Sequence, residues 1–359
     1  MQAEPLITWS EPAREFVGFV AQFLALGAVG FRFAALRDRV SAQAAATGAA
    51  PLLGEGDIYR HAARRAATLG LLGAVIQAVM RWSSLPQAAS RAHLTVGQAL
   101  MSNFQIGAPV WLLALAIIGF ALGSAGVRAG WWLALIGEVV GPLLPLFSGK
   151  WLSLVNPVHR LVGGLWIGTL FVLVVVGLAT VLGDERSKER RGAVAADMVN
   201  GFSPLALTCG GLLVLSGLIT AYRHLSPFSS LWTTPYGWTL LVKLCFVAGV
   251  FALGAWNWRR QRPQLGSEGA AVAIRRSSRA ELTLATCVLV ATAILVSLPS
   301  PQAMKRRAAG ARGAGAGAPA VGAPGAAGPG AGAAAAGAEG APPRTTPSGV
   351  GTQPAAPAP

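Results

Sequence analysis

Five residues of the chain are of the types that bind soft metal ions. They are the histidines His93, His159 and His224 and the methionines Met80 and Met101. Imidazole nitrogen and thioether sulfur are donors that suit copper, so we expect binding of Cu(I) or Cu(II) if the fold gathers these side chains. Taken singly, each has a plainer interpretation, because a histidine at a membrane surface is often a polar anchor and a methionine often fills space.

Two ionisable side chains lie inside apolar runs, where a charge is costly. Glu138 occurs in LIGEVVGPLLPLF and Lys243 in YGWTLLVKLCF. An intramembrane charge is a functional hypothesis by default, here the passage of ions or protons. The alternative is a buried ion pair, or a lone group that reaches a water pocket. Cys209 and Cys287 leave a similar choice between a second soft-metal site and small residues at helix contacts.

The elements that must position these residues are membrane-spanning helices. The 359 residues are 53% hydrophobic and only 12% charged, with a mean hydropathy of +0.54, whereas soluble domains are about 25% charged. An apolar run of about 20 residues crosses the bilayer core as a helix, which satisfies its own backbone amides. We therefore predict an all-α, polytopic transmembrane helical bundle of about eight spans. The predicted spans are residues 15–35, 64–81, 99–121, 130–149, 158–182, 202–222, 236–257 and 281–299.

Basic residues are divided unevenly between the two sets of loops. One set carries 16 Lys and Arg, and the other set, with the N-terminus, carries 6. Since cytoplasmic loops are enriched in Lys and Arg, the first set is predicted to be cytoplasmic, and both termini extracytoplasmic. The first span lacks the features of a cleaved signal peptide, so we expect it to be retained. In this frame His93, His159 and His224 all fall at the outer membrane face. The predicted cytoplasmic loops are residues 36–65, 122–129, 183–201 and 258–280.

The chain divides into a membrane region and a tail. Residues 1–302 hold the spans, whereas residues 303–359 are rich in Ala, Gly and Pro and are expected to be disordered, because they bury too little to offset their ordering entropy. The net charge of +15 is confined to loops and tail, so the lipid bilayer and not nucleic acid is the expected partner. We expect no enzyme, since the sequence contains no Ser-His-Asp set, phosphate loop or HExxH motif.

Several short motifs from residue 158 to residue 301 resemble the copper resistance protein D (CopD) family of membrane proteins. One is a span that opens with His159 and continues to Trp166 and Gly168; another is a final span led by Glu281. The segments that carry the resemblance are HRLVGGLWIGTL (159–170), FSPLAL (202–207), GLITAYRHL (217–225), YGWTLLVKL (236–244) and RAELTLATCVLVATAILVSLPSP (279–301).

The resemblance implies movement of copper across the inner membrane of a bacterium, or copper tolerance. It also implies a periplasmic copper-binding partner of the CopC type. One position departs from the family pattern: many members have Ser-Gly-His before the fifth span, but here the stretch is FSGKW, with Lys150 in place of the histidine. A protonated lysine is a poor ligand, so copper binding at this position is in question.

The favoured hypothesis is a transporter that takes copper ions at the outer face and passes them between helices. His159 and His224 would capture the ion with help from His93, Met80 or Met101. One alternative is a redox protein that holds a b-type haem between His159 and His224. Another is a membrane scaffold that has lost transport, as the missing histidine at position 150 would allow.

Overall fold

The computed structural model describes residues 9–37, 55–148, 151–183, 191–225, 228–261, 268–302 and 304–305. Every regular element in these ranges is a helix, so the all-α prediction is confirmed. The chain divides into two units, Met1–Ala311 and Arg312–Pro359, and all described residues belong to the first. Except for residues 304 and 305, the predicted tail lies outside the described residues.

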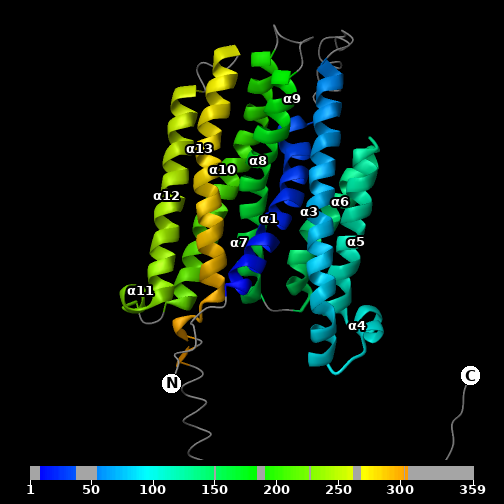
Figure 1. Ribbon diagram of the computed structural model, residues 1–359, viewed down its shortest axis with the longest axis vertical. Coiled ribbons are helices and arrows are strands. Elements are labelled where there is room, and N and C mark those ends of the chain that lie inside the picture. The colour runs from blue at the N-terminus through cyan, green and yellow to red at the C-terminus, as the bar shows by residue number, and fades with distance from the viewer. Residues whose placement is uncertain are drawn as a thin grey trace, which may run out of the picture. The chain divides into compact units, whose positions relative to one another are not determined.

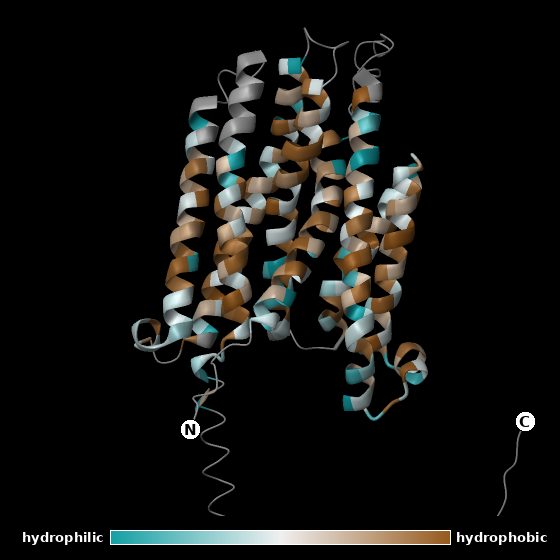
Figure 2. Cartoon of the chain, in the orientation of Figure 1, coloured by the Kyte–Doolittle hydropathy of each residue, from teal (hydrophilic) through white to brown (hydrophobic). Residues whose placement is uncertain are grey.

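Eight helices are long and apolar enough to cross a membrane, as the sequence predicts. Their middle turns are mostly apolar, and hydrophilic residues lie nearer their ends (Figure 2). These features fit helices that expose apolar side chains to lipid and polar ones to water. The eight are Ser10–Leu36, Ile58–Arg91, Phe104–Ser124, Arg128–Phe147, Val155–Gly183, Arg191–Arg223, Pro235–Trp256 and Ser278–Ser297.

Shorter helical elements build or join these spans (Figure 1). Three of them, η1, η4 and η5, are π-helical turns that widen the backbone within a span. The elements are α1 (Ser10–Gly30), η1 (Phe31–Leu36), α3 (Glu55–Arg91), α4 (Val96–Ser102), α5 (Phe104–Ser124), α6 (Arg128–Leu143), η2 (Leu144–Ser148), η3 (Trp151–Leu154), α7 (Val155–Gly163), η4 (Gly164–Gly168), α8 (Thr169–Val172), η5 (Leu173–Gly177), α9 (Leu178–Gly183), α10 (Arg191–His224), α11 (Ser230–Thr233), α12 (Pro235–Gln261) and α13 (Glu268–Ser297).

The predicted third span, residues 99–121, begins too early. Its first residues belong to α4, which Thr95 caps through a reciprocal pair of hydrogen bonds with Gln98. Asn103 then breaks the helix and caps α5 with its side-chain oxygen. Two caps in succession end one helix and start another, because each satisfies backbone N–H groups that a continuous helix would pair internally.

Close packing without side chains holds α1 at the centre of the described spans. Gly27 of α1 lies directly against Gly168 of η4, and a Cβ at either position would overlap the backbone of the other helix. Gly73 of α3 lies equally close to the α1 backbone. Such contacts suit a membrane protein, since dispersion between closely approaching helices replaces the hydrophobic effect there.

The fully buried apolar residues gather toward one end of the spans, which we call the core end. Phe31, Ala66, Phe120 and Met198 are fully buried in one cluster there, contributed by η1, α3, α5 and α10. The opposite end, where α1 begins and α3 finishes, has no comparable cluster around α1 among the described residues. We call it the cavity end, for the reason given below.

Candidate functional site

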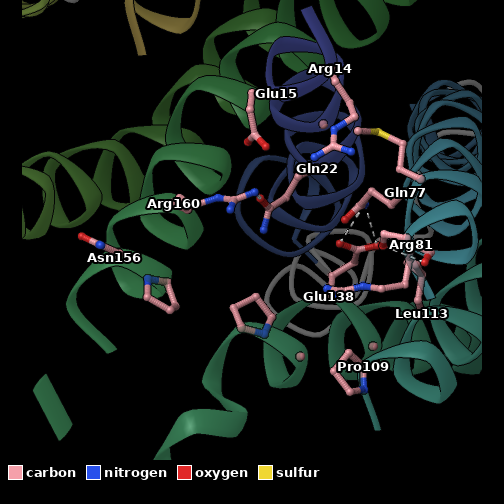
Figure 3. A pocket seen from close by; sticks show the side chains of 17 residues that line it. Arg14, Glu15, Gln22, Gln77, Arg81, Pro109, Leu113, Glu138, Asn156 and Arg160 are labelled. Atoms are coloured by element: carbon pink, nitrogen blue, oxygen red, sulfur yellow. Dashed lines mark hydrogen bonds between the residues drawn. The ribbon is translucent and has the colours of Figure 1, made fainter. Parts of the chain in front are cut away.

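A cavity of about 590 Å³ lies at the cavity end among α1, α3, α5, α6 and α7 (Figure 3). Its walls are unusually polar for the interior of a membrane domain. A polar cavity within a span is a site where ions or polar solutes enter, because such groups are otherwise excluded from the bilayer. The charged and amide side chains that line it are Arg14, Glu15, Gln22, Gln77, Arg81, Glu138, Asn156 and Arg160.

Glu138 lies deepest among the carboxylates and is only 4% exposed. Gln77 of α3 donates from Nε2 to both carboxylate oxygens, at 3.3 and 3.4 Å. The neighbouring Gly137 lets α6 approach α5 so closely that a Cβ there would overlap the carbonyl oxygen of Leu112. The close packing of α5 and α6 therefore fixes the height of Glu138, and Gln77 fixes its orientation.

Arg160 ties α7 to α1 on the opposite wall. Its Nη2 donates to Oε1 of Gln22 at 3.0 Å, and its guanidinium carbon lies 4.8 Å from the centre of the Phe19 ring. The charges of Glu15 and Arg81 act on the same guanidinium. Figure 3 shows Arg14 and Arg160 reaching the cavity from two different helices.

His159 faces away from this cavity, toward α10. Its Nδ1 lies 2.9 Å from the Ser216 hydroxyl, which itself donates to the Leu212 carbonyl at 2.6 Å. Since the serine proton is used on that carbonyl, the histidine donates through Nδ1–H, and the Nε2 of the neutral ring keeps its lone pair. His159 therefore presents one nitrogen that can bind a metal ion. The Lys243 charge of α12 acts on the same ring.

The other predicted ligands lie in several places at the cavity end. Met80 lines the cavity, with its methyl carbon against Gly18 of α1. Met101 is 78% exposed on α4, and His93 is exposed in the preceding turn with a φ of 55°. His224 is the last residue of α10, and its side chain lies outside the described part of the structure.

The structure thus separates Met80 from His159, because one lines the cavity and the other contacts α10. Across the described ranges, no group of three or more His, Cys, Asp or Glu side chains is placed to hold a metal ion. Lys150 lies outside the described residues.

The predicted alternative of an ion pair between Glu138 and Lys243 is wrong for the described structure. Glu138 bonds to Gln77, whereas Lys243 acts on His159 from another helix. Of the two cysteines, Cys209 is buried in α10 and Cys287 is half-buried in α13, and both are free thiols.

Sequence reasoning missed the three arginines of the cavity, which entered only as counts for topology. A signal was available in the spacing. Arg14, Gly18 and Gln22 recur every four residues on α1, and Gln77, Arg81 and Ser84 recur every three or four on α3. This period places each set on one helix face. Two polar faces at the same end of neighbouring spans are the pattern of a shared cavity.

Comparison with known proteins identifies the C-terminal half. Residues 196–295 match the family model described as Copper resistance protein D. A stretch of 202 residues is 31% identical to the "Copper transport protein CutJ" of Bacillus subtilis (strain 168), covering 53% of this chain and 35% of that protein. The chain thus spans about a third of the length of the curated relative it matches. No solved structure matches. The resemblance seen in the motifs of residues 158–301 is confirmed, and this chain is a multi-pass, copper-related membrane protein that belongs, through residues 196–295, to the copper resistance protein D family.

Proposed function

We propose that this protein transports copper ions across the inner membrane of a bacterium, taking them at the extracytoplasmic face. The observation that carries the proposal is the polar cavity, which runs from the end of the spans to the buried carboxylate of Glu138. The copper resistance family and the copper transport relative supply the identity of the cargo. Copper is therefore treated as a substrate in passage and not as a resident cofactor.

The proposed ligands act in succession, because the structure spreads them over the cavity end. His93 and Met101 are exposed there and would meet the incoming ion. Met80 offers a thioether in the cavity wall, and His159 offers Nε2 beside α10, with His224 at the end of that helix. Soft donors spaced in this way favour transfer over permanent binding.

Glu138 and Lys243 are assigned to the passage itself. Glu138 lies below Met80's helix neighbour Gln77 and supplies the negative charge that a cation needs within the membrane. Lys243 sets the electrostatic environment of His159. A cation on Nε2 of His159 and the ammonium of Lys243 repel each other, which favours release of the ion from this ring.

The orientation follows from the basic loops and from the two unlike ends. We propose that the cavity end is extracytoplasmic, since the loops of the core end are the more basic set. Both termini are then extracytoplasmic. A periplasmic copper-binding protein of the CopC type would deliver the ion to this face. Residues 1–302 form the transport domain in this proposal, and residues 303–359 form a tail without a transport role.

Copper accumulation in cells tests the proposal. Glu138→Gln removes the charge of the carboxyl group and keeps its shape, and Met80→Leu removes the sulfur. We expect either change to lower the initial rate of accumulation about tenfold, as for loss of a charged or coordinating contact. Met198→Leu is the matched control, because Met198 is fully buried in the apolar cluster of the core end. Unchanged accumulation in both cavity variants, at equal membrane levels, would contradict this route.

A further inference from the structure

The charges that line the cavity do not suit a bare metal cation. Three guanidinium groups, those of Arg14, Arg81 and Arg160, face two carboxylates, those of Glu15 and Glu138. A hydrated copper ion that entered alone would meet a net positive surface. Met80 supplies the single thioether among the lining residues, and within the described ranges no histidine lines the cavity.

We propose that the cavity receives copper as an anionic carboxylate complex, that is, as a chelate whose carboxylate groups bind the arginines. The inference deepens the proposed function and rests on it, since it concerns the form in which the cargo arrives. All lining residues lie between positions 14 and 160, outside the segment 196–295 that matches the family model. The selectivity of this cavity is therefore a property of this chain's own N-terminal half.

The arrangement of the arginines matches a ligand with several carboxylates. They come from α1, α3 and α7, so their guanidinium groups approach the cavity from three sides. A guanidinium binds a carboxylate through two parallel hydrogen bonds, and three such groups surround a polycarboxylate without crowding. The volume of about 590 Å³ lies in the range of roughly 300–1,000 Å³ typical of sites for small organic ligands.

The remaining polar groups complement the metal in the same ligand. Glu138 and the Met80 thioether lie deeper or to one side of the arginine groups and can approach the copper ion of a chelate. A simple anion would find Glu138 repulsive, and a simple cation would find the arginines repulsive. A metal chelate carries both signs in one molecule, as the cavity does.

Phosphate groups of lipids share the oxyanion chemistry of carboxylates and are the other source of a ligand for these arginines. Arg14 and Arg81 are exposed near the end of their helices, where headgroups lie. The cavity continues past them to Glu138, which is 4% exposed. A headgroup held at the bilayer surface would leave this inner part unused, so we favour the chelate.

Binding of two copper complexes of opposite charge tests the inference. The full-length protein would be placed in phosphatidylcholine nanodiscs and titrated calorimetrically with Cu(II)–citrate, which is anionic at pH 7, and with Cu(II)–ethylenediamine, which is cationic. We expect the citrate complex to bind about tenfold more tightly. Arg14→Gln and Arg81→Gln should each weaken citrate binding about fivefold. Arg91→Gln is the matched control, since Arg91 is also exposed at the end of α3 and does not line the cavity.

The possible outcomes separate the ligand from the transport activity. Equal affinity for the two complexes, or arginine variants that bind citrate as the wild type does, would overturn the inference. Loss of citrate binding in phosphatidylglycerol nanodiscs would assign the arginines to lipid and overturn it as well. Proteoliposomes that accumulate copper from ethylenediamine, independently of Arg14 and Arg81, would retain the proposed transport and reject the chelate. Arginine-dependent citrate binding without any copper accumulation would retain the ligand and reject the transport.

Discussion

The Ser216 hydroxyl determines which nitrogen of His159 is available to a metal ion. It accepts from Nδ1–H and donates to the Leu212 carbonyl, so it holds both the tautomer and the ring orientation. Groups that hydrogen-bond a ligating histidine raise its basicity and fix its direction. Ser216 is thus a positioning residue and not a ligand.

Ser216→Ala removes this support and leaves His159 in place. We expect copper affinity at this position to fall about tenfold, the lower range for loss of a group that orients a ligand. A competitive Cu(I) titration of the purified protein would measure it. Thr208→Ala is the control, because Thr208 is exposed on the same helix. If the two variants bind copper equally well, His159 is not held for metal binding by this serine.

At the residue scale, the sequence predicts which side chains could do chemistry but not which of them meet. His159 and Met80 are both found at the cavity end, as the loop charges and span count lead one to expect. Their separation depends on the rotation of α7 and α3 about their own axes, which is set by packing. The same rotation turns Arg160 toward Gln22. No composition or span length carries that information.

At the element scale, the number of spans is predictable and their ends are not. A run of apolar residues must be a helix in lipid, so all eight spans were found. Beyond the hydrocarbon, a helix can continue or stop, since water satisfies the backbone in either case. Residues predicted as loops accordingly form the first turns of α3, from Glu55, and of α13, from Glu268. Local caps, such as Thr95 and Asn103, decide the remaining boundaries.

The contact between α1 and η4 places the wall that carries Arg160, and it depends on the absence of side chains. A methyl group at Gly168 would overlap the Phe23 carbonyl of α1. Gly168→Ala should therefore push α7 and η4 away from α1 and destabilise the domain by about 2 kcal/mol, as for overpacked cores. Thermal unfolding in detergent would show it as a lower Tm. Gly211→Ala is the control, because a Cβ there meets nothing within 4 Å. Equal Tm values for the two variants would show that the close contact is not required.

At the scale of the whole described unit, the two ends differ in a way that defines a transport state. The cavity end is polar and hollow, whereas the core end is packed with apolar side chains. Hydrogen bonds also join helices at the core end: Tyr59 donates to Asp197 at 3.3 Å, and Arg65 donates to Thr180 at 3.5 Å. The structure therefore has the form of a transporter open at one face only, and an ion that reached Glu138 would stop there. The sequence predicts which end is basic, but the closure arises from long-range packing.

Opening of the core end is the step that this state still requires, and it is testable through the Tyr59 bond. Tyr59→Phe removes one hydrogen bond to Asp197 and should favour opening by about 1 kcal/mol, or about fivefold in the ratio of the two states. Ala66 reports the opening, since it is fully buried in the core-end cluster. After replacement of the native cysteines, an Ala66→Cys protein in inside-out vesicles would be treated with a membrane-impermeant maleimide. We expect faster labelling when Tyr59→Phe is added.

A cysteine at the cavity end provides the internal comparison for that experiment. Ser84 lines the cavity, so Ser84→Cys should react from the extracytoplasmic side, and more slowly once Tyr59→Phe favours the opposite state. Two accessibilities that change in opposite directions indicate alternation between faces, because a merely loosened bundle would raise both. Copper added to the wild-type background should move both rates in the same directions as Tyr59→Phe if the ion is the cargo. Labelling at position 66 that ignores both the substitution and copper would mean that the core end does not open during function.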